Sequence, residues 1–191
     1  MSAYSLEKFK KELPKQYINI GIAEQNLVNL ATGLALSGKK VFIYAIATFI
    51  TQRCYEQIRV NLSGMNLPVT IIGTGPGFTY GADGYTHHTI EDIALLRVLP
   101  NLTILNPCDA ISSAAALKIA YHSKHPVYVR IDKGKLPLIY RTSADLQNGL
   151  FLCKKGDDAL IFTTGIFTHK IAQLINNLKN RRLKVGLVDV F

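Results

Sequence analysis

Short apolar runs alternate with segments of helical periodicity along most of this sequence. The clearest run, residues 41–47, follows a stretch in which apolar residues between Leu27 and Ala35 are three and four positions apart. A continuous apolar run is expected for a strand buried on both faces, and the three-and-four spacing is that of one helix face. Strands that alternate with helices form parallel sheets with right-handed crossovers. We therefore expect an α/β fold, an open parallel sheet with helices on both faces.

The boundaries of the expected elements follow from local signals. Gly38 is placed to end the first long helix, and Asp109 can cap another because its carboxylate can accept N–H groups of the first turn. We expect strands at 17–21, 41–47, 69–73, 102–105, 127–131, 159–163 and 184–190. We expect a helix whose first turn contains Glu24 and which Gly38 ends, and further helices at 51–62, 90–99, 110–120 and 166–178.

The alternation breaks down before the last part of the chain. Residues 134–156 contain Pro137, Asn148 and Gly149 and show no period, so we expect a linker there. Residues 157–191 supply only one β-α-β unit, which is too little for a domain with covered strand edges. We expect one domain over 1–145, then over 146–191 a linker and the beginning of a second, incomplete α/β domain.

The composition excludes several classes of protein. Hydrophobic residues make up 48% of the chain, too many for a disordered tail. No apolar run approaches the roughly 20 residues of a membrane span, and no apolar leader opens the chain. The three cysteines are widely spaced, which fits a reducing compartment and no metal pattern. We expect a cytoplasmic protein without a membrane partner.

The net charge of +9 favours anionic ligands. The basic residues do not form one stripe and are not interleaved with aromatic residues, so we do not expect a nucleic-acid partner. A phosphorylated small substrate or an acidic protein partner suits this charge.

Candidate ligand-binding residues follow several of the expected strands, where open parallel sheets bind ligands. Glu24 lies in the first turn of a helix, where the helix dipole favours a carboxylate. An acidic residue with no function is also common at this position, and this spacing alone favours that interpretation. The loop 73–78 is rich in glycine, but Pro76 lacks an N–H donor and no P-loop lysine follows. A flexible loop is the favoured interpretation over a phosphate cradle.

A second group of candidates is polar or charged. His87 and His88 lie near Asp83, but adjacent side chains rarely face one metal ion, so a hydrogen-bonding or proton-transfer role for a histidine is favoured. Arg130 ends a strand and has the fork geometry to hold a phosphate; a surface salt bridge is the alternative.

Six segments carry a resemblance to a known family by coming in a fixed order. They are IGIAEQN at 20–26, ATF at 47–49, QRCYE at 52–56, GADGYTH at 81–87, LRVLPNL at 96–102 and PVYVR at 126–130. The set resembles the pyrimidine-binding domain of the transketolase family, which includes 1-deoxyxylulose-5-phosphate synthase. The resemblance runs from about residue 15 to 140, and residues 157–191 resemble the start of the family's carboxyl-terminal domain.

The resemblance implies thiamine diphosphate as the cofactor, with its aminopyrimidine bound here. Glu24 matches the family glutamate that hydrogen-bonds the pyrimidine ring nitrogen and favours its imino tautomer, which makes Glu24 a catalytic candidate. Phe49, Gln52 and Tyr55 match the aromatic pocket around the pyrimidine. Gln52 stands where the family often has another aromatic residue.

The resemblance also implies a substrate site for phosphorylated sugars. Asp83 and His87 match the Asp-Gly-x-Thr-His segment that contacts substrate hydroxyls, and His87 is a second catalytic candidate. Arg130 matches the arginine near the sugar phosphate, and Asp132 beside it is unusual and could weaken anion binding. His88 replaces the usual glutamine.

The sequence lacks the family's diphosphate–Mg²⁺ motif, a Gly-Asp-Gly followed downstream by Asn. We therefore expect a diphosphate-binding partner chain or domain to hold Mg²⁺ and share the cofactor, no metal site here, and an oligomer. The leading interpretation is a transketolase-like transferase, for ketol transfer or deoxyxylulose phosphate synthesis. The alternatives are a 2-oxo-acid dehydrogenase beta subunit and a non-catalytic interaction module of the same fold.

Overall fold

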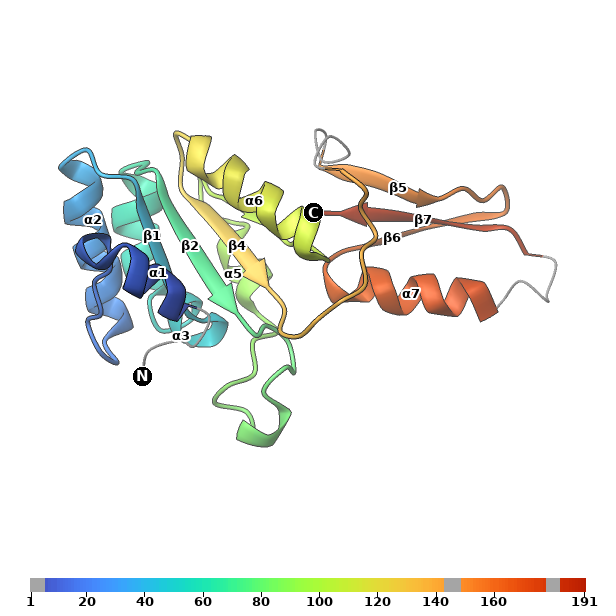
Figure 1. The fold of residues 1–191 in the computed structure, drawn as a ribbon, viewed down its shortest axis with the longest axis horizontal. Helices are drawn as coiled ribbons and strands as arrows, with labels where there is room; N and C mark the ends of the chain where they lie inside the picture. The colour runs from blue at the N-terminus through green and yellow to red at the C-terminus, as the bar shows by residue number, and fades with distance from the viewer. Residues whose placement is uncertain (1–5, 143–148, 178–182) are drawn as a thin grey trace.

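A computed structural model describes residues 6–142, 149–177 and 183–191, which form two α/β parts (Figure 1). The first sheet is parallel, as the sequence predicts, and its strand order is β1-β2-β4-β3. Its strands are β1 Val41–Ile46, β2 Val69–Thr74, β3 Thr103–Leu105 and β4 Val127–Ile131. The predicted domain boundary near residue 145 lies outside the described residues.

Helices cover both faces of this sheet, because alternate side chains of a strand point to opposite faces. Tyr128 of β4 packs in the core that includes Val28 of α2, whereas Val127 and Val129 pack against Ala116 of α6. The described helices of this part are α1 Glu7–Glu12, α2 Glu24–Leu36, α3 Ala47–Thr51, α4 Tyr55–Gln57, α5 Asp92–Leu96 and α6 Ala110–His122. Short turns of other helix types are η2 Pro14–Gln16, the π-helix η3 Ile58–Gly64 and η4 Gly81–Asp83.

The second part is a smaller sheet with the strand order β5-β7-β6. Its elements are β5 Leu150–Lys154, β6 Ala159–Thr163, α7 Ile166–Asn177 and β7 Val185–Val190. The parallel pair β6 and β7 with α7 is the predicted β-α-β unit. β5 is antiparallel to β7 and corrects the prediction of a linker through residue 156. Its inward residues, Phe151 and Cys153, alternate with exposed leucines. Because both faces of β5 carry apolar residues, its sequence lacks the alternation of polar and apolar residues that predicts a strand.

Three other predictions need correction. Residues 17–21 form no strand; the N–H of Gly21 donates to the Asn19 side chain, and Gly21 has a φ of +76°. The helix predicted at 51–62 begins earlier, as α3, and is interrupted before α4 and η3. The helix predicted at 90–99 is reduced to α5. Local side-chain hydrogen bonds, such as that of Asn19, compete with regular structure at such positions.

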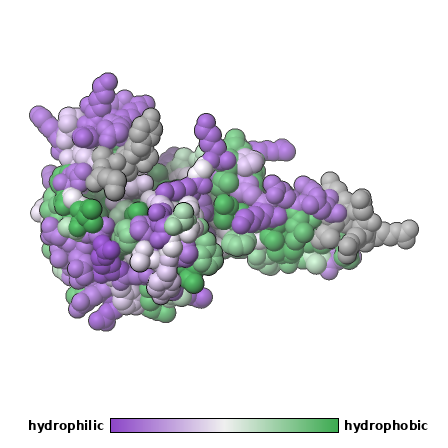
Figure 2. All heavy atoms as spheres, turned by 90° about the horizontal axis from the view of Figure 1, so that it is seen from below, coloured by the Kyte–Doolittle hydropathy of each residue, from purple (hydrophilic) through white to green (hydrophobic). Residues whose placement is uncertain are grey.

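Polar contacts hold the second part to the first. They include the hydrogen bonds from Asn106 to Thr164 (2.9 Å), from Tyr140 to Asp189 (2.6 Å) and between His169 and the Cys108 carbonyl (2.6 Å). Figure 2 shows the outline that results, a broad first part and a narrow second part. No helix in the described ranges is long and apolar enough to cross a membrane.

The cysteines provide a test of this packing. Cys54 and Cys108 are buried and Cys153 is partly buried, and all are free. Burial raises the pKa of Cys54 to about 12 and of Cys153 to about 11, so little reactive thiolate forms near pH 8. We expect slow iodoacetamide alkylation of the native chain, with Cys153 modified first, measured by peptide mass spectrometry. All three should react quickly in denaturant, and fast labelling of native Cys54 would contradict the packing.

Candidate functional site

Most of the predicted site residues lie near one edge of the first sheet. The strands are parallel, so their carboxyl ends meet at that edge. Phe49 is on α3, which begins directly after β1, and Arg130 is near the end of β4 at this edge. His87 is on the loop between β2 and α5, and Glu24 is the first residue of α2. The fold therefore places chemistry-bearing residues from distant segments around the same edge.

The Glu24 carboxylate is held by Arg53. Its Oε2 accepts a hydrogen bond from Nη1 of Arg53 at 2.8 Å, and the Glu24 side chain is only 11% exposed. The Gln25 side chain donates to the Arg53 carbonyl at 3.2 Å. Within the described ranges Oε1 of Glu24 accepts no hydrogen bond, which leaves a carboxylate oxygen able to bind a ligand donor.

Aromatic contacts extend this pair across the site. The guanidinium carbon of Arg53 lies 4.4 Å from the Phe49 ring centroid, a cation–π contact. The His87 ring meets Phe49 edge-on with centroids 5.1 Å apart, and Tyr80 lies 5.8 Å from His87. Arg53 and Phe49 thus join Glu24, predicted to bind the cofactor, to His87, predicted to bind the substrate, in one cluster. Sequence reasoning gave Arg53 no role, although it lies within the QRCYE segment.

The structure does not join the other predicted cofactor residues to this cluster as directly. Gln52 donates to Glu91 at 2.5 Å and accepts from Thr48 at 3.0 Å, so its carboxamide links α3 to the segment before α5. Tyr55 is partly buried and packs against the hydrophobic core of the first part. Asp83 lies exposed at the end of η4.

The loop that carries His87 is closed at its base. Gly77 and Thr89 exchange backbone hydrogen bonds of 2.7 and 2.9 Å. Gly75 has a φ of +66°, and a Cβ there would lie 2.3 Å from the Tyr80 ring, so only glycine fits. The Thr86 hydroxyl lies 3.0 Å from Nδ1 of His87 and orients the imidazole. This closure gives His87 a defined position beside Phe49.

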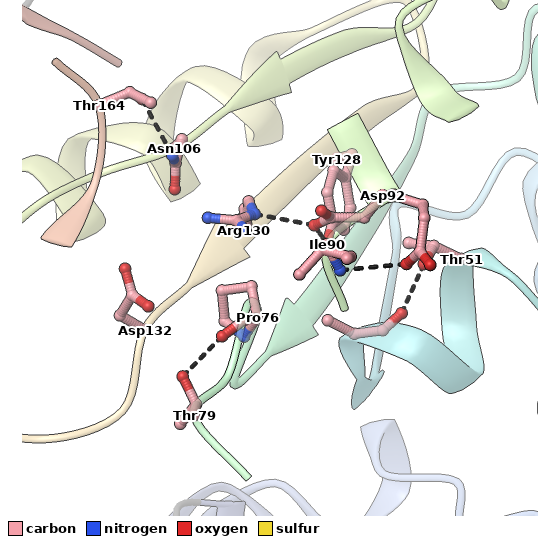
Figure 3. Close-up of polar contacts among 12 residues, drawn as sticks. Thr51, Pro76, Thr79, Ile90, Asp92, Asn106, Tyr128, Arg130, Asp132 and Thr164 are labelled. Atoms are coloured by element: carbon pink, nitrogen blue, oxygen red, sulfur yellow. Dashed lines mark hydrogen bonds and ion pairs between the residues drawn. The ribbon is translucent and has the colours of Figure 1, made fainter. Parts of the chain in front are cut away.

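Arg130 is partly buried and pairs with a buried carboxylate, in contrast to the surface salt bridge considered from the sequence. Its Nε donates to Oδ2 of Asp92 at 2.8 Å, and the Tyr128 hydroxyl donates to the same oxygen at 2.8 Å (Figure 3). The Asp92 side chain is 1% exposed. Burial, reinforced by the Asp92 charge, raises the pKa of Tyr128 well above its ordinary value, so Tyr128 is a stable donor. Neither Asp92 nor Tyr128 was predicted as part of a site.

Asp132 has a structural contact in addition to its proximity to Arg130. Its Oδ2 accepts a hydrogen bond of 3.2 Å from the N–H of Ile166, the first residue of α7. Burial raises the pKa of Asp132, and the Arg130 charge opposes this shift. The carboxylate therefore connects the end of β4 to the second part of the chain.

Among the described residues no group of three or more histidine, cysteine or acidic side chains could hold a metal ion.

Comparison with known proteins identifies the family. Residues 3–139 match the transketolase pyrimidine binding domain, and this match covers more than half of the 191 residues. The chain belongs to the transketolase family. This confirms the resemblance inferred from the six ordered segments.

Individual transketolase relatives agree with this assignment. One subunit of an apulose-4-phosphate transketolase from Phocaeicola vulgatus is 43% identical over 136 residues, which are 71% of this chain and 44% of that protein. A 1-deoxy-D-xylulose-5-phosphate synthase from Crocosphaera subtropica is 34% identical over 189 residues, or 96% of this chain and 29% of that protein.

A solved structure extends the agreement to the fold. The structure described as a split gene transketolase, inactive beta4 tetramer, has a TM-score of 0.88 and 33% identity, over 99% of this chain and 62% of that one. The α/β architecture, including the second sheet, is therefore that of transketolase relatives. The chain spans less than two thirds of the length of each of these relatives.

Proposed function

We propose that this chain is the pyrimidine-binding part of a thiamine diphosphate-dependent, transketolase-like transferase that acts on phosphorylated sugars. The reaction is two-carbon ketol transfer or the related synthesis of deoxyxylulose phosphate. The observation that carries the proposal is the largely buried Glu24 carboxylate, whose Oε1 accepts no hydrogen bond in the described part of the chain, beside the Phe49 cluster.

The residues present fit the aminopyrimidine of the cofactor. A flat heterocycle needs an aromatic or apolar contact and a polar group for its ring nitrogen, and Phe49 and Glu24 offer these. When bound, the cofactor supplies the carbon nucleophile of the reaction. Glu24 would share a proton with the pyrimidine ring nitrogen through its free carboxylate oxygen, while Arg53 holds the other carboxylate oxygen. We propose Gln52 and Tyr55 as further cofactor contacts, at the margin of the Glu24–Phe49 cluster.

The substrate residues have complementary chemistry. His87 can donate to, or exchange a proton with, a substrate oxygen, and Asp83 on the same loop can accept from a sugar hydroxyl. Arg130 offers a cationic fork for the phosphate. The relative from Phocaeicola vulgatus is named for apulose 4-phosphate, a phosphorylated sugar, which supports this substrate class.

We also propose that the active site needs a second, diphosphate-binding chain or domain, which holds Mg²⁺ with the cofactor diphosphate. Two relatives support a partner: one is named as a single subunit of a transketolase, and the other is described as a split gene transketolase whose beta4 tetramer is inactive. We infer an oligomer as well, because the cofactor would be bound between this chain and its partner, and the split gene relative is described as a tetramer. The free cysteines support a cytoplasmic location.

Reconstitution tests the function. We expect ketose cleavage when the full chain is mixed with a diphosphate-binding partner, thiamine diphosphate and Mg²⁺, and at most about 1% of that rate from either chain alone, because each would bind only part of the cofactor. Omission of the cofactor is the control.

Full turnover by this chain alone would contradict the partner requirement. A mixture that neither binds the cofactor in calorimetry nor turns over sugars would support a non-catalytic module instead. A comparison of xylulose 5-phosphate with pyruvate and branched oxo acids separates the transferase from a 2-oxo-acid dehydrogenase component.

A further inference from the structure

Asp92 is a buried carboxylate with two donors on one oxygen. Arg130 Nε and the Tyr128 hydroxyl both donate to Oδ2 at 2.8 Å. Oδ1 is buried and has no hydrogen-bond partner within residues 6–142, 149–177 and 183–191. Burying an unpaired carboxylate costs folding free energy. The ion pair with Arg130 is therefore the interaction that stabilises Asp92 at this buried position.

The contact with Asp92 uses the side of the guanidinium that faces into the protein. Only Nε is engaged, and in Figure 3 the Nη end of Arg130 points away from Asp92, toward the side where Asn106 and Asp132 lie. The described part of the chain offers these Nη groups no hydrogen bond. The two Nη groups are the donors that a phosphate takes in a fork geometry.

The geometry of β4 fixes the positions of Tyr128 and Arg130, the two residues that donate to Asp92. Tyr128 and Arg130 are two residues apart on β4 and share one face of the sheet. Gly73 on β2 pairs in register with Arg130, and a Cβ at Gly73 would lie 2.6 Å from the Tyr128 hydroxyl. Glycine at this position therefore makes room for the hydroxyl that holds Asp92.

We propose that Asp92, held by Tyr128, is a positioning residue that fixes the Arg130 guanidinium with its Nη groups presented to the phosphate of the sugar substrate. This inference rests on the proposed function. It assigns the specificity of the enzyme for phosphorylated sugars to Asp92, a residue that does not touch the substrate. An arginine held in advance loses less side-chain freedom when it binds phosphate, so the contribution appears in substrate affinity.

The test compares Asp92→Asn with the wild type in the reconstituted complex. Asparagine keeps the shape and one acceptor but removes the charge that holds Nε. We expect KM for a phosphorylated ketose to rise about tenfold with kcat changed less than about twofold, and KM for the unphosphorylated ketose to stay constant. Asp157→Asn, which alters an exposed ion pair with Lys184, is the matched control and should change neither KM.

Tyr128→Phe keeps the carboxylate and removes one of its donors, so a smaller rise of about threefold in the same KM is expected. If Asp92→Asn does not assemble with the partner, Tyr128→Phe tests the positioning role in its place. An unchanged KM, or equal rises for both ketoses, would overturn the positioning role.

Arg130→Ala and Glu24→Gln separate this inference from the proposed function. If Arg130→Ala raises KM for the phosphorylated ketose alone, and the Asp92 and Tyr128 variants do not, the positioning role is wrong and the function stands. Full activity of Glu24→Gln would instead overturn the proposed function. A phosphate-specific rise in KM for Asp92→Asn, with Glu24→Gln inactive, supports both.

Discussion

Replacing Glu24 by glutamine is expected to lower kcat of the reconstituted enzyme by about 100-fold or more, as for other residues that manage a proton at the reacting group. Glutamine has the same shape but cannot share an acidic proton with the pyrimidine ring nitrogen. The measurement is steady-state turnover at saturating cofactor. Glu56→Gln, at an exposed position on α4, is the matched control and should retain wild-type turnover.

Loss of folding should not explain this result. Glu24 pairs with Arg53, whose side chain is 46% exposed, and pairs with an exposed partner contribute at most about 1 kcal/mol. The urea unfolding midpoint of Glu24→Gln should therefore remain close to that of the wild type. Turnover within about threefold of the wild type would contradict the catalytic assignment.

Replacing Asp109 by alanine is expected to reduce the free energy of unfolding by about 3 kcal/mol. Asp109 is buried at the start of α6 and accepts hydrogen bonds from the backbone N–H of Ser112 (2.8 Å), Ile139 (2.8 Å) and Tyr140 (2.9 Å), and from the Ser112 hydroxyl (2.7 Å). The substitution removes a helix cap and leaves buried donors unpaired. Urea denaturation measures the change.

The exposed Asp157→Ala is the control and should change stability by less than about 0.5 kcal/mol. An equally small change for Asp109→Ala would mean that these hydrogen bonds do not hold residues 139–140 against α6.

The contribution of Asp109 should depend on pH. Burial opposes its charged form, but the donors from Ser112, Tyr140 and Ile139 outweigh burial and lower the pKa of Asp109 below its ordinary value. A lowered folded-state pKa stabilises the protein above the unfolded-state pKa of about 4 and loses this effect as pH falls through the folded-state pKa. The stability difference between wild type and Asp109→Ala should therefore be constant above about pH 5 and narrow in more acidic solution.

The regular part of the fold could be predicted from the sequence because its signals are local. The apolar runs of β2 and β4 have near-continuous hydrophobicity, and the Asp109 cap precedes a helix, so β2, β4 and α6 were predicted within a few residues. β5 was missed because its pairing with β7 joins distant segments and its leucines obscure the alternation of Phe151 and Cys153. Such pairing depends on tertiary contacts more than on local propensity.

The site was predictable to the extent that it follows ordered segments. Glu24, Phe49 and His87 come from three such segments, and their proximity requires the sheet to bring the segments together. Arg53 and Asp92 were not predicted, because a charged residue in a helical segment resembles a solvated one until its partner is known. The partner of Asp92 is Arg130, 38 residues along the chain.

The most direct test of the central claim is a crystal structure of this chain with its diphosphate-binding partner and thiamine diphosphate. We predict a Glu24 carboxylate oxygen within hydrogen-bonding distance, about 3 Å, of the pyrimidine ring nitrogen. A bound cofactor whose pyrimidine lies away from Glu24, with that carboxylate facing solvent, would contradict the claim.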